Sequence, residues 1–148
     1  MPRSLMNIRT LTILLLALSA PLLAAGCGGD PNLASVYGVV TLNGQPLPKA
    51  FLTFIPQGGK GSPSYGKTDD AGRYQMQFSD SASGAWIGRN LVKISTADAV
   101  NPEVTIPEQV PPAYNRNSDL YRTVEQGKNQ FDFELKSDGI VEVKPYEG

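Results

Sequence analysis

Apolar and polar residues alternate along most of the chain after residue 35, which is the pattern of half-buried β-strands. The clearest example is the run at residues 73–78, where Tyr74, Met76 and Phe78 alternate with polar residues. Further runs of this kind occupy residues 36–42, 50–56, 64–68, 92–95, 120–124 and 130–135. About seven short strands, separated by turn signals and with no amphipathic helix after residue 30, predict an all-β, antiparallel, seven-stranded β-sandwich.

Two segments predict hairpins. In residues 38–56, Asn43-Gly44 separates the runs VVTL and AFLTFIP, and Asn-Gly is a strong signal for a two-residue turn. Pro46 and Pro48 remove two backbone donors just after this turn. The second run is apolar on both sides, which favours an interior strand. We expect residues 125–129 to connect the last two strands as a second hairpin.

A turn is predicted at residues 69–72, where Asp69 and Asp70 precede Gly72. A calcium site is the alternative interpretation of the two aspartates. An EF-hand loop, however, needs spaced oxygen ligands that end in a bidentate Glu, and no residue after Gly72 supplies them. We therefore expect no metal and no cofactor in this chain.

The first 26 residues have the pattern of an export signal. Arg3 and Arg9 are followed by an almost wholly apolar stretch at residues 11–23. This stretch is too short for a permanent transmembrane helix, and a signal peptide explains it better than a buried N-terminal helix.

The motif Ala24-Ala25-Gly26-Cys27 resembles a bacterial lipobox, whose cysteine becomes lipidated and N-terminal. A chance cysteine is the alternative. The resemblance implies a signal peptide at 1–26, a flexible tether at 27–34, a sandwich domain at 35–136 and a C-terminal tail at 137–148. Acyl chains such as palmitate would join Cys27 to the membrane, since two or more chains anchor a protein stably.

Charge and composition exclude several function classes. The chain has 13 Lys and Arg, 14 Asp and Glu, one Cys and no His. Without a basic field we expect no nucleic-acid partner. Without His, neither a Ser-His-Asp triad nor a His-ligated zinc site can form. Asp132 and Glu134 suggest a glycosidase pair, but they alternate with core residues and fit a solvated strand face better.

Three aromatic residues are candidate ligand contacts: Trp86, Tyr65 and Tyr114. An exposed Trp86 would provide a stacking surface for a sugar ring. A packed Trp86 would close one end of the sandwich, and we favour packing because an indole buries a large area.

A series of turn and core residues carries a family resemblance. They read Val36-x-Gly38-x-Val40, Asn43-Gly44-x-Pro46-Leu47, Ala50-x-Leu52-x-Phe54-x-Pro56, Thr68-Asp69-x-x-Gly72-x-Tyr74 and Gly88-x-x-x-Val92-x-Ile94. This series resembles the carboxypeptidase regulatory-like domain, a transthyretin-like or prealbumin-like sandwich. The later segment, with Phe131-x-Phe133-x-Leu135, is similar to small lipoproteins of planctomycete bacteria.

The resemblance implies a domain without catalytic activity. We therefore expect an exported lipoprotein of the cell envelope, facing the periplasm or the cell surface and anchored through Cys27. It would serve as a structural or ligand-binding module with an envelope protein or a glycan as partner. A carbohydrate-binding or adhesion module that uses exposed aromatic residues is the alternative, and an enzyme is not expected.

Overall fold

The computed structural model describes residues 30–97 and 107–137. This part of the chain consists almost entirely of short β-strands, with a single-turn 3-10 helix η1 (Pro112–Tyr114). The strands are β1 (Leu33–Leu42), β2 (Gln45–Pro46), β3 (Phe51–Pro56), β4 (Ser64–Lys67), β5 (Arg73–Gln75), β6 (Gln77–Ser79), β7 (Ala82–Ser83), β8 (Ala85–Trp86), β9 (Gly88–Ser95), β10 (Leu120–Val124), β11 (Lys128–Gln130) and β12 (Phe133–Leu135).

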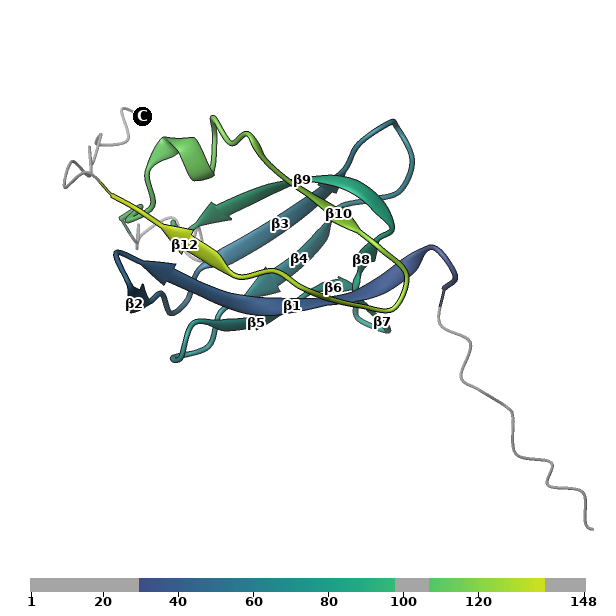
Figure 1. Cartoon of the computed structure of the whole chain (residues 1–148), viewed down its shortest axis with the longest axis horizontal. Coiled ribbons are helices and arrows are strands. Elements are labelled where there is room, and N and C mark those ends of the chain that lie inside the picture. The colour runs from purple at the N-terminus through teal and green to yellow at the C-terminus, as the bar shows by residue number, and fades with distance from the viewer. Residues whose placement is uncertain (1–29, 98–106, 138–148) are drawn as a thin grey trace, which may run out of the picture.

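The strands form two sheets that pack face to face (Figure 1). In the first, which we call the β1 sheet, β1 pairs antiparallel with β2, β5 and β8 and parallel with β11 and β12. The second, the β3 sheet, has the order β10-β9-β3-β4-β6-β7 and is antiparallel throughout. The predicted all-β sandwich is therefore confirmed, with antiparallel sheets except where β1 meets β11 and β12.

The hydrophobic core lies between the two sheets. Leu52 and Phe54 are the inward residues of β3, and Ala50 lies just before the strand. All three side chains are buried, as the alternation predicts. The rings of Phe131 and Phe133 lie 6.2 and 6.4 Å from that of Phe54, so aromatic contacts join the sheets at the centre. The other buried apolar residues are Ala34, Val36, Val40, Leu47, Tyr74, Met76, Ala85, Val92, Ile94, Val110, Val124 and Leu135.

The first predicted hairpin is wrong in its second strand. Asn43 and Gly44 do form the turn, with φ values of 53° and 81°, but they join β1 only to the two-residue β2. The chain then crosses to the β3 sheet, where β3 pairs with β4 and β9. Pro46 and Pro48 have no N–H with which to extend the ladder, so the hairpin ends there. As predicted, β3 is an interior strand.

The strand predicted at residues 73–78 is divided at Met76. On one side β5 pairs with β1, and on the other β6 pairs with β4 of the opposite sheet. Met76 is fully buried and its N–H donates to the carbonyl of Val36 at 2.9 Å. The chain therefore passes from one sheet to the other through the core.

The turn predicted at residues 69–72 is present. Asp69 Oδ1 accepts hydrogen bonds from the N–H groups of Ala71 and Arg73, at 2.9 and 2.8 Å, and Gly72 has a φ of 74°. The carboxylate of Asp69 is therefore engaged with its own turn. Across residues 30–97 and 107–137, no group of three or more metal-ligating side chains is close enough together to hold an ion.

The second predicted hairpin is also wrong. Its first strand, β10, pairs with β9, whereas β11 and β12 pair with β1 in the other sheet. Asn129 determines this path because its side chain bonds both the N–H and the C=O of Glu125 and also the carbonyl of Ser35. Residues 125–129 are thus a side-chain-bonded crossover between sheets.

The domain begins two residues earlier than the sequence suggests. Leu33 and Ala34, assigned to the tether, belong to β1 because they pair with Trp86 and Ala85. The predicted leader and Cys27 lie outside the described residues, as does most of the predicted tail. In the described part, no helix has the length and hydropathy needed to span a bilayer.

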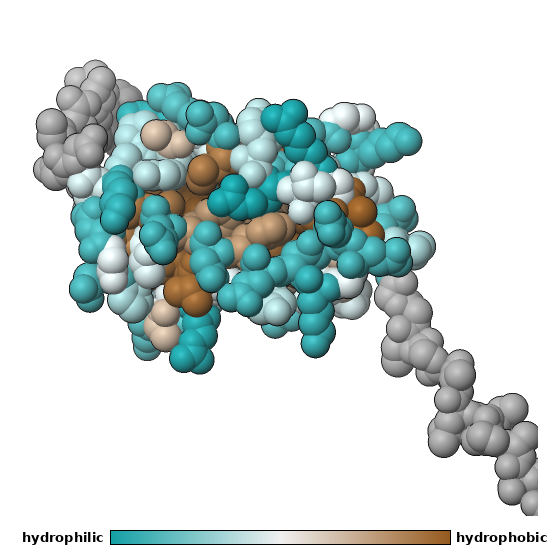
Figure 2. Space-filling view, viewed as in Figure 1, coloured by the Kyte–Doolittle hydropathy of each residue, from teal (hydrophilic) through white to brown (hydrophobic). Residues whose placement is uncertain are grey.

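The side of the sandwich where β10 and β12 lie shows a band of hydrophobic surface between polar margins (Figures 1 and 2). Half-buried Leu120 and Phe131 pack against the core here. Arg122 has its guanidinium carbon 4.9 Å from the ring centre of Phe133. Arg122 therefore covers the core with a cation–π contact.

Candidate functional site

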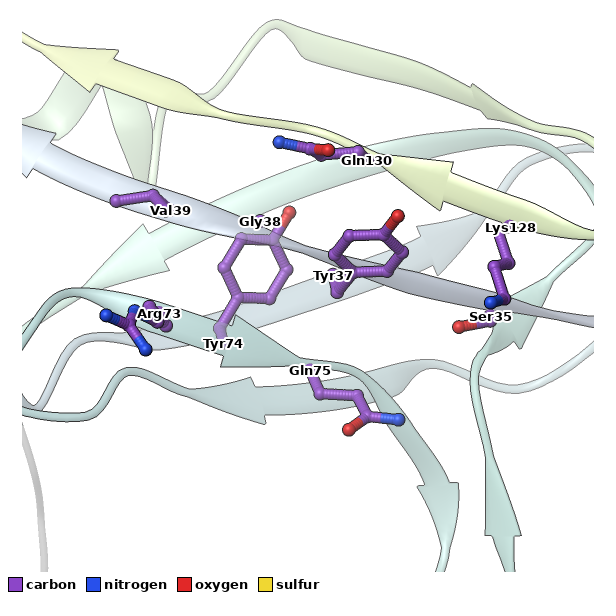
Figure 3. Close-up of a pocket in the computed structure, with 9 residues that line it drawn as sticks. All are labelled: Ser35, Tyr37, Gly38, Val39, Arg73, Tyr74, Gln75, Lys128 and Gln130. Carbon is purple, nitrogen blue, oxygen red and sulfur yellow. The ribbon is translucent and has the colours of Figure 1, made fainter.

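A shallow, open depression of about 460 Å³ lies on the outer face of the β1 sheet. Figure 3 shows its residues on three neighbouring strands, β5, β1 and β11, with Tyr37 near the centre. The lining consists of Ser35, Tyr37, Gly38, Val39, Arg73, Tyr74, Gln75, Lys128 and Gln130.

Strand register places an aromatic ring between two amides. Tyr37 is the Cα partner of Gln75 on β5 and of Gln130 on β11, so the three side chains form one row across the sheet (Figure 3). Tyr37 is 37% exposed. Adjacent rows add one cation each, with Lys128 opposite Ser35 and Arg73 opposite Val39. The surface can therefore stack on a planar or ring-shaped ligand and donate hydrogen bonds around it.

A close backbone approach beneath Tyr37 fixes this geometry. A Cβ on Gly38 would lie 2.0 Å from the carbonyl oxygen of Phe131, so only glycine fits. The same oxygen accepts a hydrogen bond from the hydroxyl of Tyr74 at 2.7 Å. The N–H of Phe131 donates to the carbonyl of Tyr37 at 2.9 Å. The backbone of β1 therefore approaches that of Phe131 closely at Gly38.

Between β11 and β12, the carboxylate of Asp132 takes the place of a backbone carbonyl as the acceptor for β1. Asp132 Oδ1 accepts the N–H of Val39 at 2.9 Å, and Asp132 Oδ2 accepts from Gln130 Nε2 at 3.2 Å. Asp132 therefore completes the hydrogen-bond ladder on the edge of β1 that lies between β11 and β12. It also orients Gln130, one of the two amides beside Tyr37. Asp132 is solvent-exposed, as expected, but its carboxylate also bonds the backbone of β1.

The buried phenol of Tyr74 is held in its protonated form. Burial, and then the negative charge of Asp132, raise its pKa far above the ordinary value, and Arg122 opposes this only in part. Tyr74 is therefore a hydrogen-bond donor throughout the physiological range, not a general base.

A second polar cluster fastens the chain after residue 106 to the end of β9. Glu108 Oε1 accepts hydrogen bonds from Thr96 N, Thr96 Oγ1 and Val110 N at 2.8 to 2.9 Å, and Oε2 accepts from Ser95 Oγ. Burial favours the neutral acid, but these hydrogen bonds outweigh it and lower the pKa of Glu108. The carboxylate is a structural clamp in its charged state.

The three aromatic residues predicted as ligand contacts do not form one site. Trp86 is half-buried, with its ring centre 6.1 Å from that of Phe78, and it fills the space beside Gly61. Tyr114 is half-buried, and its hydroxyl accepts the N–H of Lys136 at 3.1 Å. Tyr65 is 58% exposed on the outer face of the β3 sheet.

Tyr37, the exposed aromatic residue of the depression, was not among the ligand contacts predicted from the sequence. A signal for it exists in the alternation of β1, where Val36 and Val40 point inward and Tyr37 must point outward. The amide neighbours gave no such signal because Gln75 and Gln130 come beside Tyr37 only through the pairing of β5 and β11 with β1.

Comparisons with known proteins give only a distant likeness. No protein-family model and no curated protein matches the chain. Among solved structures, a DUF3823 family protein from Parabacteroides merdae is similar over 72% of this chain and 47% of its own length, with 18% identity and a TM-score of 0.41. The chain therefore spans about half the length of that protein.

Replacing Gly38 tests the close approach. Gly38→Ala is expected to lower the free energy of unfolding by about 1–3 kcal/mol, because the new methyl group must displace Phe131 and the Tyr74 bond. Urea denaturation measures the change. Ser35→Ala, three residues earlier on the same strand, should stay within about 0.5 kcal/mol. A Gly38→Ala protein as stable as Ser35→Ala would contradict the geometry.

The Glu108 clamp predicts a specific pH dependence. Because folding lowers the pKa of Glu108 from its ordinary 4.5, its contribution to stability is present above that value and is lost as the pH falls through the folded pKa. Glu108→Gln should therefore destabilise the protein at pH 7 and differ much less from wild type under strongly acidic conditions. Urea titrations at several pH values measure this, with exposed Glu134→Gln as control. A pH-independent difference would refute the clamp.

Proposed function

We propose that this chain is a lipid-anchored, non-catalytic binding module of the cell envelope, with a carboxypeptidase regulatory-like sandwich of the planctomycete lipoprotein type as its body. The turn and core motifs between Val36 and Ile94 support the family assignment. The observation that carries the binding role is the depression around Tyr37, in which an exposed ring lies between two amides on a rigid central strand.

The N-terminal sequence supports the anchor. A positively charged segment, an apolar stretch and small residues precede Cys27, as in exported lipoproteins. In the structure β1 begins at Leu33, six residues after this cysteine. Six residues reach at most about 20 Å, so lipidation at Cys27 would hold the sandwich close to the bilayer surface.

The available side chains support binding over catalysis. The chain has no His, and the one buried phenol of the depression, Tyr74, is held protonated. Ser35 lines the depression, but among the described residues its hydroxyl has no hydrogen bond to its Cα partner Lys128 or to any other side chain that would activate it. Stacking and hydrogen bonding are the interactions that remain.

The anchor is tested by removing its sulfur. In cells, Cys27→Ala is expected to move the protein from the detergent phase to the aqueous phase of a phase-partition assay, because no acyl chain can be attached. Cys27→Ser is the conservative control and should behave in the same way, while wild-type protein should carry the mass of its acyl chains. Unchanged partitioning of both variants would refute the lipid anchor.

Carbohydrate binding is the second candidate, and Tyr37 favours it. A tyrosine ring flanked by Gln75 and Gln130 offers an apolar surface for a sugar ring and amides for its hydroxyl groups. Of the aromatic residues named for this role from the sequence, Trp86 and Tyr114 are largely occupied by packing.

A neutral-glycan array tests this candidate. Tyr37→Ser is expected to weaken binding about tenfold or more because the stacking surface is lost, whereas Tyr37→Phe should keep most of the affinity. Calorimetry on the best array ligand measures both. A chain that binds no neutral glycan, or a Tyr37→Ser protein with unchanged affinity, would contradict it.

A further inference from the structure

The depression around Tyr37 has a cation at each end. Strand register places Lys128 of β11 opposite Ser35 and Arg73 of β5 opposite Val39, so the two cations lie on opposite sides of β1 and in different rows. Ser35 and Val39 are four positions apart on β1, and four residues of a strand span about 13 Å. A ligand that reaches both cations therefore has to be longer than a single sugar ring.

Both cations are available to a ligand. Within residues 30–97 and 107–137, neither the ammonium of Lys128 nor the guanidinium of Arg73 donates a hydrogen bond or joins an ion pair, and both residues are exposed. Figure 3 shows the Lys128 side chain reaching from β11 toward Ser35, so a cation and a hydroxyl lie together at one end of the depression. An ammonium and a hydroxyl side by side can both donate to one carboxylate.

The middle of the depression suits an uncharged part of the same ligand. Tyr37 offers the exposed face of its ring, and Gln75 and Gln130 beside it offer amide donors and acceptors. Asp132 lies next to this row and accepts hydrogen bonds from Gln130 Nε2 and from the N–H of Val39, at 3.2 and 2.9 Å. Its negative charge disfavours a second anion here, so the acid groups of a ligand belong at the two ends.

An extended peptide fits this surface less well than a sugar chain does. Peptides commonly bind by adding a strand to a free sheet edge, where main-chain hydrogen bonds supply the affinity. At Tyr37, β1 already pairs with β5 on one side and with β11 on the other, so it offers no such edge. The groups that remain on this face are a ring and side-chain amides, which suit the faces and hydroxyl groups of sugar rings.

We propose that the depression binds a short acidic oligosaccharide. One carboxylate would pair with Lys128 and Ser35, and a second would reach Arg73 at the other end. Between them, a sugar ring would stack on Tyr37 while the two amides bond its hydroxyl groups. This inference rests on the carbohydrate-binding role proposed above for the same depression, and it adds the charge and the minimum length of the ligand.

The test uses the full chain, purified in mild detergent, and two probes that differ only in charge: the trimer of galacturonic acid and its full methyl ester. We expect the Kd of the acid to be about fivefold or more below that of the ester, and added salt to raise the Kd of the acid alone. Calorimetry measures both values. Equal Kd values would overturn the inference and leave the carbohydrate-binding role standing. A chain that binds neither probe would also overturn it, and the neutral-glycan array then decides that role separately.

A pair of charge variants locates the effect. The double variant Arg73→Gln, Lys128→Gln should bind the acid and the ester alike, because amide side chains can still donate hydrogen bonds but carry no charge. A matched double variant, Lys49→Gln, Arg116→Gln, removes the same charge at exposed positions outside the depression and should keep the preference for the acid. Circular dichroism checks that both variants are folded. An equal loss of preference in the two variants would overturn the proposal, because only net charge would matter.

Two other anionic ligands are distinguished in the same assay. Hexaglutamate represents an acidic peptide, and phosphatidylcholine vesicles that contain phosphatidylglycerol represent an anionic membrane. Tyr37→Ser should weaken the binding of both sugar probes, since both lose the stacking surface. The proposal would be overturned if hexaglutamate or the vesicles bound more tightly than the acidic trimer and lost that binding in the Arg73→Gln, Lys128→Gln variant.

Discussion

The contact between the Gly38 position and the carbonyl of Phe131 is the constraint on which the fold depends most. Strand β1 is the one strand of its sheet that pairs on both sides, with β5 on one edge and β11 and β12 on the other. Where β11 ends and β12 has not begun, backbone groups would lack partners in the core. Gly38 allows the chain to come close enough for Tyr74 to bond the Phe131 carbonyl and for Asp132 to bond Val39.

The alternation of apolar residues predicted the buried faces well but not the strand partners. Leu52, Phe54 and Met76 are buried as their period of two indicates. A period of two, however, identifies only the face on which a side chain lies. Whether a turn returns the chain to the same sheet depends on a few polar contacts, such as those of Asn129, which tie residues 125–129 to β1. The hairpin predicted around residues 125–129 failed for this reason, whereas the one after Asn43-Gly44 stops at β2 because Pro46 and Pro48 cannot extend the ladder.

Candidate ligand contacts were harder to predict because an aromatic residue serves equally well in a core and on a surface. Trp86 was a candidate ligand contact as the single tryptophan of the sequence, yet it packs against Phe78. Tyr37 is the more exposed ring, and its amide neighbours come from β5 and β11, which are distant in the sequence.

The different outer surfaces of the two sheets follow from how a sandwich divides its side chains. One face of each sheet packs against the core, so the side chains of the other face can vary without loss of packing. On the β1 sheet that freedom places a ring among amides, and on the β3 sheet it places rings among cations. With the proposed anchor joined to the start of β1, at one end of the sandwich (Figure 1), the bilayer would approach an end of the body. Both broad faces would then remain open to envelope polymers, and each could evolve its own ligand.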